Sequence, residues 1–226
     1  MVNTYAKTIK TLRQANKFSQ QEVAKKLGIS RPSYVALEQG KRELSLKEAG
    51  IISELFGISL EEFLPSVTAR HRKYEQMLFA FLRHTTRDGR LPKTKLAKLL
   101  YLADFGWFYN MHKSMSGLPY RKIEYGPVPN YYFALLAELD RDGKIAIESK
   151  GKVSLISETR VGEKIGDDLL GPKEKKFIKE VAKKWRDKNT KEIVDFTHNQ
   201  LPYTFADEGA VIPYELITQE DPEHVY

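Results

Sequence analysis

The stretch from Ser19 to Gly40, SQQEVAKKLGISRPSYVALEQG, decides the fold of the N-terminal part of the chain. It contains two short helical patterns separated by a break. Ser19 and Glu22 form a capping box at the start of the first pattern, and Gly28 lies where a left-handed C-cap is expected. Ser30 then begins a second helix as its N-cap. Two such helices joined by about three residues are typical of a helix-turn-helix, which predicts that this stretch reads DNA.

The flanking sequence predicts the rest of a compact, mainly α-helical domain over residues 1–66. A helix before the motif would bury Ile9 and Leu12. Its basic side chains are expected to face solvent: Lys7, Lys10, Arg13 and Lys17. Two more capping boxes follow the motif: Ser45 with Glu48, and Ser59 with Glu62. Together these patterns predict a five-helix domain in which Tyr34 and Leu37 belong to the core.

The composition restricts the class of protein. The chain has 226 residues, enough for one large or two modest domains, and a net charge of +7 that is spread over its whole length. It has no cysteine, which excludes disulfides and thiolate metal sites. No apolar run approaches the roughly 18 residues of a membrane span, and the polar start is unlike a signal peptide. We therefore expect a cytoplasmic protein that does not contact a membrane.

Residues 67–226 predict a second, larger α+β domain of helices with a small antiparallel sheet. The apolar stripe of residues 94–110 is too wide for a surface helix, which indicates a buried central helix. Alternating apolar runs on either side of residues 149–152 predict a β-hairpin. Further helices are expected over residues 74–83, 130–142, 172–187 and 190–198. A turn-rich break is expected near residues 85–92, and Phe133 is expected to be buried.

The first domain resembles a known family of DNA-binding domains. The pattern TIKTLRQANKFSQQEVAKKLGISRPSYVALEQGKR, followed by SLKEAGIISELFGISLEEFL, resembles the Cro/C1-type, or xenobiotic-response-element, helix-turn-helix domains of phage repressors. The resemblance implies that Gln20 braces against DNA, and that bases are read from the start of the second motif helix. The implied base-reading positions are Arg31, Pro32 and Ser33, with Val35 and Ala36 one turn further on.

Individual side chains of this motif have more than one interpretation. Arg31 could bind a guanine edge through two hydrogen bonds, and Lys41 and Arg42 suit phosphates. Glu38 matches a position that makes a structural bond within such domains. Because one small domain reads few base pairs, we expect a homodimer on a two-fold operator in double-stranded DNA. Ile51 could contribute to the dimer contact or belong to the core.

The second domain shows no pattern of an enzyme. The five histidines are scattered without metal-ligand spacing, and no phosphate-binding or nucleophile motif occurs. Asp104 lies within an apolar helix, where a carboxylate hydrogen-bonded to partners is more expected than a catalytic acid. A histidine at a helix C-terminus, such as His198, interacts favourably with the helix dipole, so its presence there needs no functional explanation. We therefore expect no catalytic residue, no metal and no cofactor.

The second domain also resembles a known family, on the segments KLLYLADFGWFY, SGLPYRKIEYGPVPNYYFALLAELDRDGKI, EIVDFTHNQLPY and AVIPYELI. Over roughly residues 74–217 these resemble the Panacea domain of SocA-type antitoxins. The resemblance implies that the domain neutralises a cognate protein toxin by binding it directly. The candidate contacts lie around the YGPVP turn, because exposed aromatic side chains favour interfaces, although core packing is the alternative. They are Tyr125, Pro127, Tyr131 and Tyr132.

Two functions follow from these patterns. The first is a type II antitoxin that binds its toxin through the second domain and regulates its own operon through the helix-turn-helix. The alternative is a prophage-type transcriptional repressor whose second domain serves dimerisation or ligand sensing.

Overall fold

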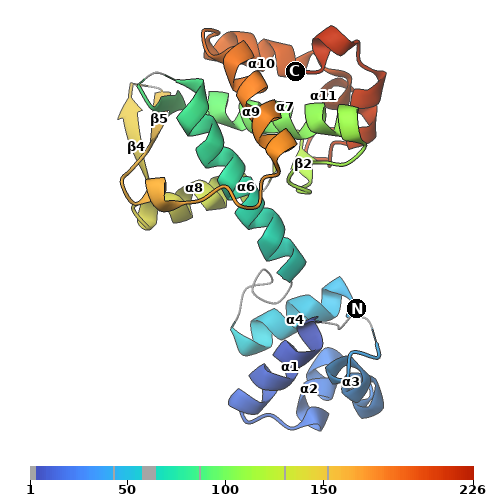
Figure 1. Ribbon diagram of the computed structural model, residues 1–226. Coiled ribbons are helices and arrows are strands. Elements are labelled where there is room, and N and C mark those ends of the chain that lie inside the picture. Colours follow the sequence, from blue (N-terminus) through green and yellow to red (C-terminus); the bar gives the residue numbers. More distant parts are fainter. Residues whose placement is uncertain (1–3, 43, 58–64, 87, 130, 152) are drawn as a thin grey trace. The chain divides into compact units, whose positions relative to one another are not determined.

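The computed structural model describes residues 4–42, 44–57, 65–86, 88–129, 131–151 and 153–226 (Figure 1). Its chain forms two compact units, Met1–Ala69 and Arg70–Tyr226. The expected combination of an N-terminal helix-turn-helix with a larger, mainly helical unit that carries a small antiparallel sheet is confirmed. No helix within the described ranges is long and apolar enough to cross a membrane.

The first unit contains the helices that the capping signals predict. They are α1 (Thr4–Ala15), α2 (Gln20–Leu27), α3 (Arg31–Glu38) and α4 (Leu46–Phe56). At α2, the Ser19 hydroxyl accepts from the Glu22 N–H and the Glu22 carboxylate accepts from the Ser19 N–H, which completes the capping box. Gly28 ends α2 with φ +68°, the left-handed conformation that favours glycine. The expected fifth helix, with its capping box at Ser59 and Glu62, lies outside the described residues.

The core of the first unit is formed by apolar side chains from the four helices that the structure describes there. Its buried members include Ile9, Val23, Leu27, Tyr34, Leu37 and Ile52. Tyr34 and Leu37 are completely buried, as predicted. Ile51 is half-buried and packs against this core, which favours its structural interpretation. Arg13 was expected to face solvent, and this was wrong: only 12 % of its side chain is exposed, because it pairs with the buried Glu38.

The second unit combines helices, two small sheets and short 3-10 turns. The helices are α6 (Pro65–Thr85), α7 (Lys93–Met111), α8 (Tyr131–Arg141), α9 (Pro172–Trp185), α10 (Thr190–His198) and α11 (Leu201–Phe205). The strands are β1 (Arg90–Pro92), β2 (Tyr120–Arg121), β3 (Val128–Pro129), β4 (Ile145–Lys150) and β5 (Val153–Glu158). The 3-10 turns are η1 (Gly162–Lys164), η2 (Tyr214–Gln219) and η3 (Pro222–His224).

The strands form two antiparallel sheets. One has the order β1-β5-β4, with Ile147 opposite Ile156 in the predicted hairpin, and the other pairs β2 with β3. In the view of Figure 1, this hairpin and the C-terminal helices lie on opposite sides of α6. The sequence interpretation missed β1, which lies in the expected turn, and the helix that it expected from residue 74 already begins at Pro65 as α6.

The central helix of this unit is α7, as predicted. Every residue from Lys95 to Gly106 is buried, and α7 contacts α9, α10 and the η2 turn. Asp104 on this helix is completely buried. Its carboxylate accepts from the Ser116 N–H at 2.7 Å, the Ser116 hydroxyl at 2.6 Å and the Tyr120 hydroxyl at 2.9 Å. Burial raises the pKa of Asp104 to about 6, although these hydrogen bonds lower it. The hydrogen-bond partners that the sequence led us to expect for this buried carboxylate are therefore present.

Helix α8 differs from the prediction in the side chains that it buries. Its buried positions are Tyr132, Leu135, Leu136 and Leu139, which follow one helical stripe. Phe133 lies about 100° around the helix from Tyr132. It is therefore 44 % exposed, which corrects the expectation that it belongs to the core.

Candidate functional site

The start of α3 presents the side chains that the sequence assigns to base reading. Arg31 and Pro32 are exposed, and Ser33, Val35 and Ala36 are half-buried. The Ser30 hydroxyl caps the helix by accepting from the Ser33 N–H at 3.3 Å. It also donates to the Ser33 hydroxyl at 3.0 Å, so the Ser33 hydrogen can point to another acceptor. Exposed donors at the positive end of a helix suit the edges of bases and the phosphates beside them.

A hydrogen-bonded network behind α3 holds these side chains in place. Glu38 accepts from Arg13 Nε at 2.6 Å through Oε1 and from Gln20 Nε2 at 3.0 Å through Oε2. Gln20 Oε1 in turn accepts from Arg31 Nη2 at 3.5 Å. Burial raises the pKa of Glu38, but hydrogen bonds from Arg13 and Gln20 outweigh it and leave that pKa below its ordinary value. The structural bond expected of Glu38 is confirmed, and it orients Gln20 between α1 and α3.

The two basic residues after α3 differ in their surroundings. Lys41 is exposed, as expected of a phosphate ligand. Arg42 is half-buried, and its Nη2 donates to Glu48 Oε1 at 2.8 Å. The guanidinium of Arg42 therefore braces the capping box that begins α4. Its Nη1 is buried, so it can contact DNA only through the part of the side chain that stays exposed.

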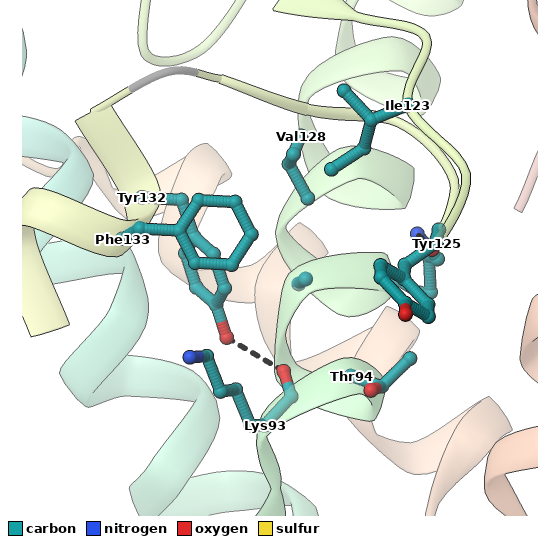
Figure 2. A pocket seen from close by; sticks show the side chains of 9 residues that line it. Lys93, Thr94, Ile123, Tyr125, Val128, Tyr132 and Phe133 are labelled. Carbon is teal, nitrogen blue, oxygen red and sulfur yellow. Dashed lines mark hydrogen bonds between the residues drawn. The ribbon is translucent and has the colours of Figure 1, made fainter.

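A pocket of about 360 Å³ lies in the second unit, between the first turns of α7, the loop before β3 and the start of α8. It is lined by Lys93, Thr94, Ala97, Lys98, Ile123, Tyr125, Val128, Tyr132 and Phe133. Figure 2 shows Tyr132 and Phe133 on one side of the pocket, Ile123 and Tyr125 on the other side, and Lys93 and Thr94 below them in this view. Lys93 Nζ lies 5.0 Å from the centre of the Phe133 ring, a cation–π contact. We call this site the α7–α8 pocket.

Lys98 is the charged group at the inner end of this pocket. Its side chain is completely buried, and its Nζ donates to the carbonyl oxygen of Tyr125 at 2.5 Å. Burial lowers the pKa of Lys98 to about 7, and no charged neighbour in the described part of the chain opposes that effect. Lys95, one turn earlier, is also buried, but its Nζ donates to the carbonyl oxygens of Arg186 and Lys188 beyond the end of α9.

Gly126 brings His198 and Lys98 together. Gly126 has φ +96°, and a Cβ built on it would overlap both Lys98 Nζ and His198 Nε2. Only glycine therefore fits between the two nitrogens. His198 Nε2 is buried and has no hydrogen-bond partner within the described residues, while the ring stacks on Tyr203 at 4.3 Å. Burial and the nearby Lys98 lower the pKa of His198, which keeps its imidazole neutral.

The four residues proposed from sequence for toxin contact do not form one surface. Tyr125 is 70 % exposed, Tyr131 is half-buried with its ring stacked on His71 at 3.5 Å, and Pro127 is buried. Tyr132 is 1 % exposed, and its hydroxyl donates to the Lys93 carbonyl at 2.6 Å. Pro127 and Tyr132 are buried, which fits the core packing that the sequence left open as the alternative.

Sequence reasoning missed the other residues of the pocket. Phe133 was assigned to the core, and Lys98 was not singled out, although it interrupts the apolar run LAKLLYLADF. The charge within an apolar helix is the signal that could have found it, because it is the same signal that drew attention to Asp104. No group of three or more metal-ligating side chains occurs in the part of the chain that the structure describes.

Comparisons with known proteins match the two parts of the chain to different families. Residues 9–63 match the helix-turn-helix family, and residues 96–202 match the family described as antitoxin SocA-like, Panacea domain. An uncharacterised helix-turn-helix-type transcriptional regulator of Methanocaldococcus jannaschii is 41 % identical over 54 residues, which are 24 % of this chain and 82 % of that protein. The uncharacterised helix-turn-helix-type regulator YqaE of Bacillus subtilis is 40 % identical over 60 residues, which are 26 % of this chain and 52 % of that protein.

No solved structure matches the chain. Both relatives match about a quarter of the chain and are named as helix-turn-helix-type regulators, so they bear on the first unit alone. The chain belongs to the helix-turn-helix transcriptional regulators through that unit, and residues 96–202 in the second unit are similar to the SocA-like antitoxin, Panacea domain family.

Proposed function

We propose that the chain is the antitoxin of a type II toxin–antitoxin system, which neutralises a protein toxin by binding it directly. The observation that carries this proposal is the presence of a Panacea domain behind a DNA-reading unit in one chain. Residues 67–226 then form the toxin-binding domain and residues 1–66 the DNA-binding domain. The α7–α8 pocket supports the proposal, because exposed aromatic side chains beside a concavity are the anchors that protein interfaces use.

The first domain regulates supply of the antitoxin in this proposal. Two copies of the chain bind a two-fold operator at their own promoter, and α3 of each copy enters the major groove. Arg31 and Ser33 contact base edges, and Pro32 and Val35 contact thymine methyl groups. Gln20, Lys41 and Arg42 contact phosphates. The gene would therefore be repressed when free antitoxin is abundant.

A second candidate function is favoured by the volume of the same pocket. About 360 Å³ is enough for a small molecule, so the second domain could sense a ligand and release α3 from DNA. Such a repressor would need no toxin. The two functions differ in whether a neighbouring gene product is toxic and whether this chain relieves its toxicity.

Growth rescue tests the antitoxin function. Each reading frame adjacent to this gene is placed under an inducible promoter, and the full chain is expressed from a second plasmid. We expect one neighbour to arrest growth and the full chain to restore it. The matched control replaces Arg31 with Ala, which should leave rescue intact, since that side chain serves DNA. If neither neighbour is toxic, or if toxicity persists with the full chain present, the proposed function is wrong.

A further inference from the structure

Lys98 has surroundings that folding alone does not explain. A buried ammonium group loses its hydration and needs three acceptors, whereas the structure gives Lys98 one carbonyl oxygen. Lys95 shows the structural alternative on the same helix, since two carbonyl oxygens beyond the end of α9 accept from it. A methionine at position 98 would fill the same space without this cost. A basic group kept at this buried position indicates a partner that arrives from outside.

The pocket above Lys98 has the charge and polarity that define this partner. Two lysines, Lys93 and Lys98, line it, and none of the described residues that line it is acidic. Apolar side chains form part of the walls, with Ile123, Val128 and Phe133 among them. Glu124 belongs to the same loop, but it is exposed and does not line the pocket. The site is therefore suited to a negatively charged group attached to an apolar stem.

The rim indicates whether the group comes from a protein or from a small molecule. Tyr125 and Phe133 are among the exposed large hydrophobic side chains of the chain, at 70 % and 44 %, and both line this pocket. Exposed aromatics around a desolvated charge are typical of the anchors of protein interfaces. A site for a small ligand would instead be expected to enclose most of that ligand's surface.

The geometry points to the α7–α8 pocket as the receptor for an acidic side chain of the toxin, whose carboxylate pairs with the ammonium groups of Lys93 and Lys98. This inference rests on the proposed antitoxin function. The stem of the acidic residue packs between Phe133 and Tyr125. The carboxylate takes the place of the Tyr125 carbonyl oxygen as an acceptor for Lys98. Gly126 permits this approach, because any larger residue would occupy the space between Lys98 and His198.

Variants of the lysines test the inference in the full chain. Lys98→Met removes the charge and keeps the length, and Lys95→Met is the matched control outside the pocket. The toxin is the neighbouring gene product that the wild-type chain neutralises, and its affinity is measured by titration calorimetry. We expect Lys98→Met to weaken binding about 30-fold or more, the usual effect of removing one partner of a buried charge pair. Lys93→Met, at the rim, should weaken it less and keeps the test available if Lys98→Met fails to fold.

The toxin supplies the complementary arm. Each of its acidic residues is changed to the corresponding amide, and one such variant should reproduce the loss seen with Lys98→Met. Combining the two changes should add little further loss, because they remove the same interaction. Additive losses for every acidic residue, or toxin affinity that Lys98→Met leaves within twofold of wild type, would overturn the inference while growth rescue still stands.

Benzoate and benzamide distinguish a small-molecule site. Both are added to the free chain, and its thermal unfolding is followed. A stabilisation by benzoate that Lys98→Met abolishes, together with unchanged toxin affinity of that variant, would assign the pocket to a small carboxylate and overturn the toxin contact. If the wild-type chain rescues no growth at all, the proposed function fails first, and that outcome is separate from either of these.

Discussion

Lys98 Nζ donates to the Tyr125 carbonyl oxygen at 2.5 Å, so a buried cation on α7 holds the backbone of the most exposed aromatic residue at the pocket rim. Burial of the Lys98 ammonium lowers the stability of the fold, and the same hydrogen bond fixes the position of Tyr125, whose side chain is available for binding. If the charge serves a partner, its removal should separate these two properties.

Lys98→Met should therefore stabilise the chain while it weakens toxin binding. Each unit of pKa shift corresponds to about 1.4 kcal/mol, so the lowering of the Lys98 pKa to about 7 implies a cost of several kcal/mol at neutral pH. Because the variant also loses the hydrogen bond to Tyr125, we expect a net increase of at least about 1 kcal/mol in the free energy of unfolding measured with urea. Lys95→Met should give a smaller gain, because burial also lowers the pKa of Lys95 but the variant removes two hydrogen bonds to carbonyl oxygens beyond the end of α9.

The same lysine should make the stability of the chain depend on pH. Because the folded state lowers the Lys98 pKa, the unfolded chain binds the proton more tightly, and the free energy of unfolding rises as the pH increases from about 7 to about 10. Below pH 7 the full cost is present. His198, the titratable neighbour, has a lowered pKa and stays neutral in this window. The stability difference between Lys98→Met and wild type should thus shrink from pH 6.5 to pH 9.5, and a constant difference would contradict this assignment.

Gly126→Ala should disrupt the turn that carries Tyr125. The added Cβ would meet Lys98 Nζ and His198 Nε2 in a backbone conformation with φ +96°. We expect the free energy of unfolding measured with urea to fall by about 2 kcal/mol or more, since backbone strain and steric overlap act together. Gly143→Ala is the matched control: it has φ +65° but open space around its Cβ position, so it should cost about 1 kcal/mol. Equal costs for both variants would show that the overlap is unimportant.

Arg31→Ala should weaken operator binding without unfolding the first unit. Loss of a contact to one base edge removes about 1–3 kcal/mol of discrimination, or roughly 5- to 150-fold in affinity for the specific site. Lys47→Ala, on the exposed surface of α4, is the control for loss of one positive charge. Gel-shift titrations with the promoter fragment and with an unrelated duplex separate the two effects. A loss that is the same on both duplexes would mean that Arg31 binds phosphate only.

Glu38→Gln should destabilise the first unit and disturb its DNA contact. Only 3 % of the Glu38 side chain is exposed. Replacing it with Gln leaves the largely buried guanidinium of Arg13 without its carboxylate partner, which should lower the free energy of unfolding by about 3 kcal/mol. Because the pKa of Glu38 is lowered in the folded state, its contribution is present above its unfolded pKa and is lost as the pH falls through the folded value. Hydrogen exchange of the α3 amides measures this locally, and unchanged protection would contradict the role of the network.

Local signals predicted the first unit well. The boxes at Ser19 and Ser45 and the glycine after α2 act over a few residues, so their pattern is visible in the sequence. Arg13 was misplaced because its partner, Glu38, lies 25 residues away. A helical pattern shows which face is polar, but it does not show which polar residue finds a distant partner.

Contacts between segments far apart in the sequence also explain why β1 and the pocket were missed. Strand β1 forms only because β5, more than sixty residues later, pairs with it through Leu91 and Ile156. Phe133 was assigned to the core from its apolar character alone, whereas its position on α8 turns it outward. Lys98 and His198 lie together because the backbone of Gly126 brings α7 and α10 into contact with one turn. Such arrangements depend on tertiary packing, which short-range periodicity does not encode.

The central claim is that this chain neutralises a toxin by direct contact. Titration calorimetry of the purified full chain into the purified neighbouring gene product tests it most directly. The account predicts saturable binding at a fixed stoichiometry for the wild-type chain, weakened about 30-fold or more by Lys98→Met and unaffected by Arg31→Ala. Absence of binding by the wild-type chain to a neighbour whose toxicity it relieves would contradict the account, because neutralisation would then not require contact.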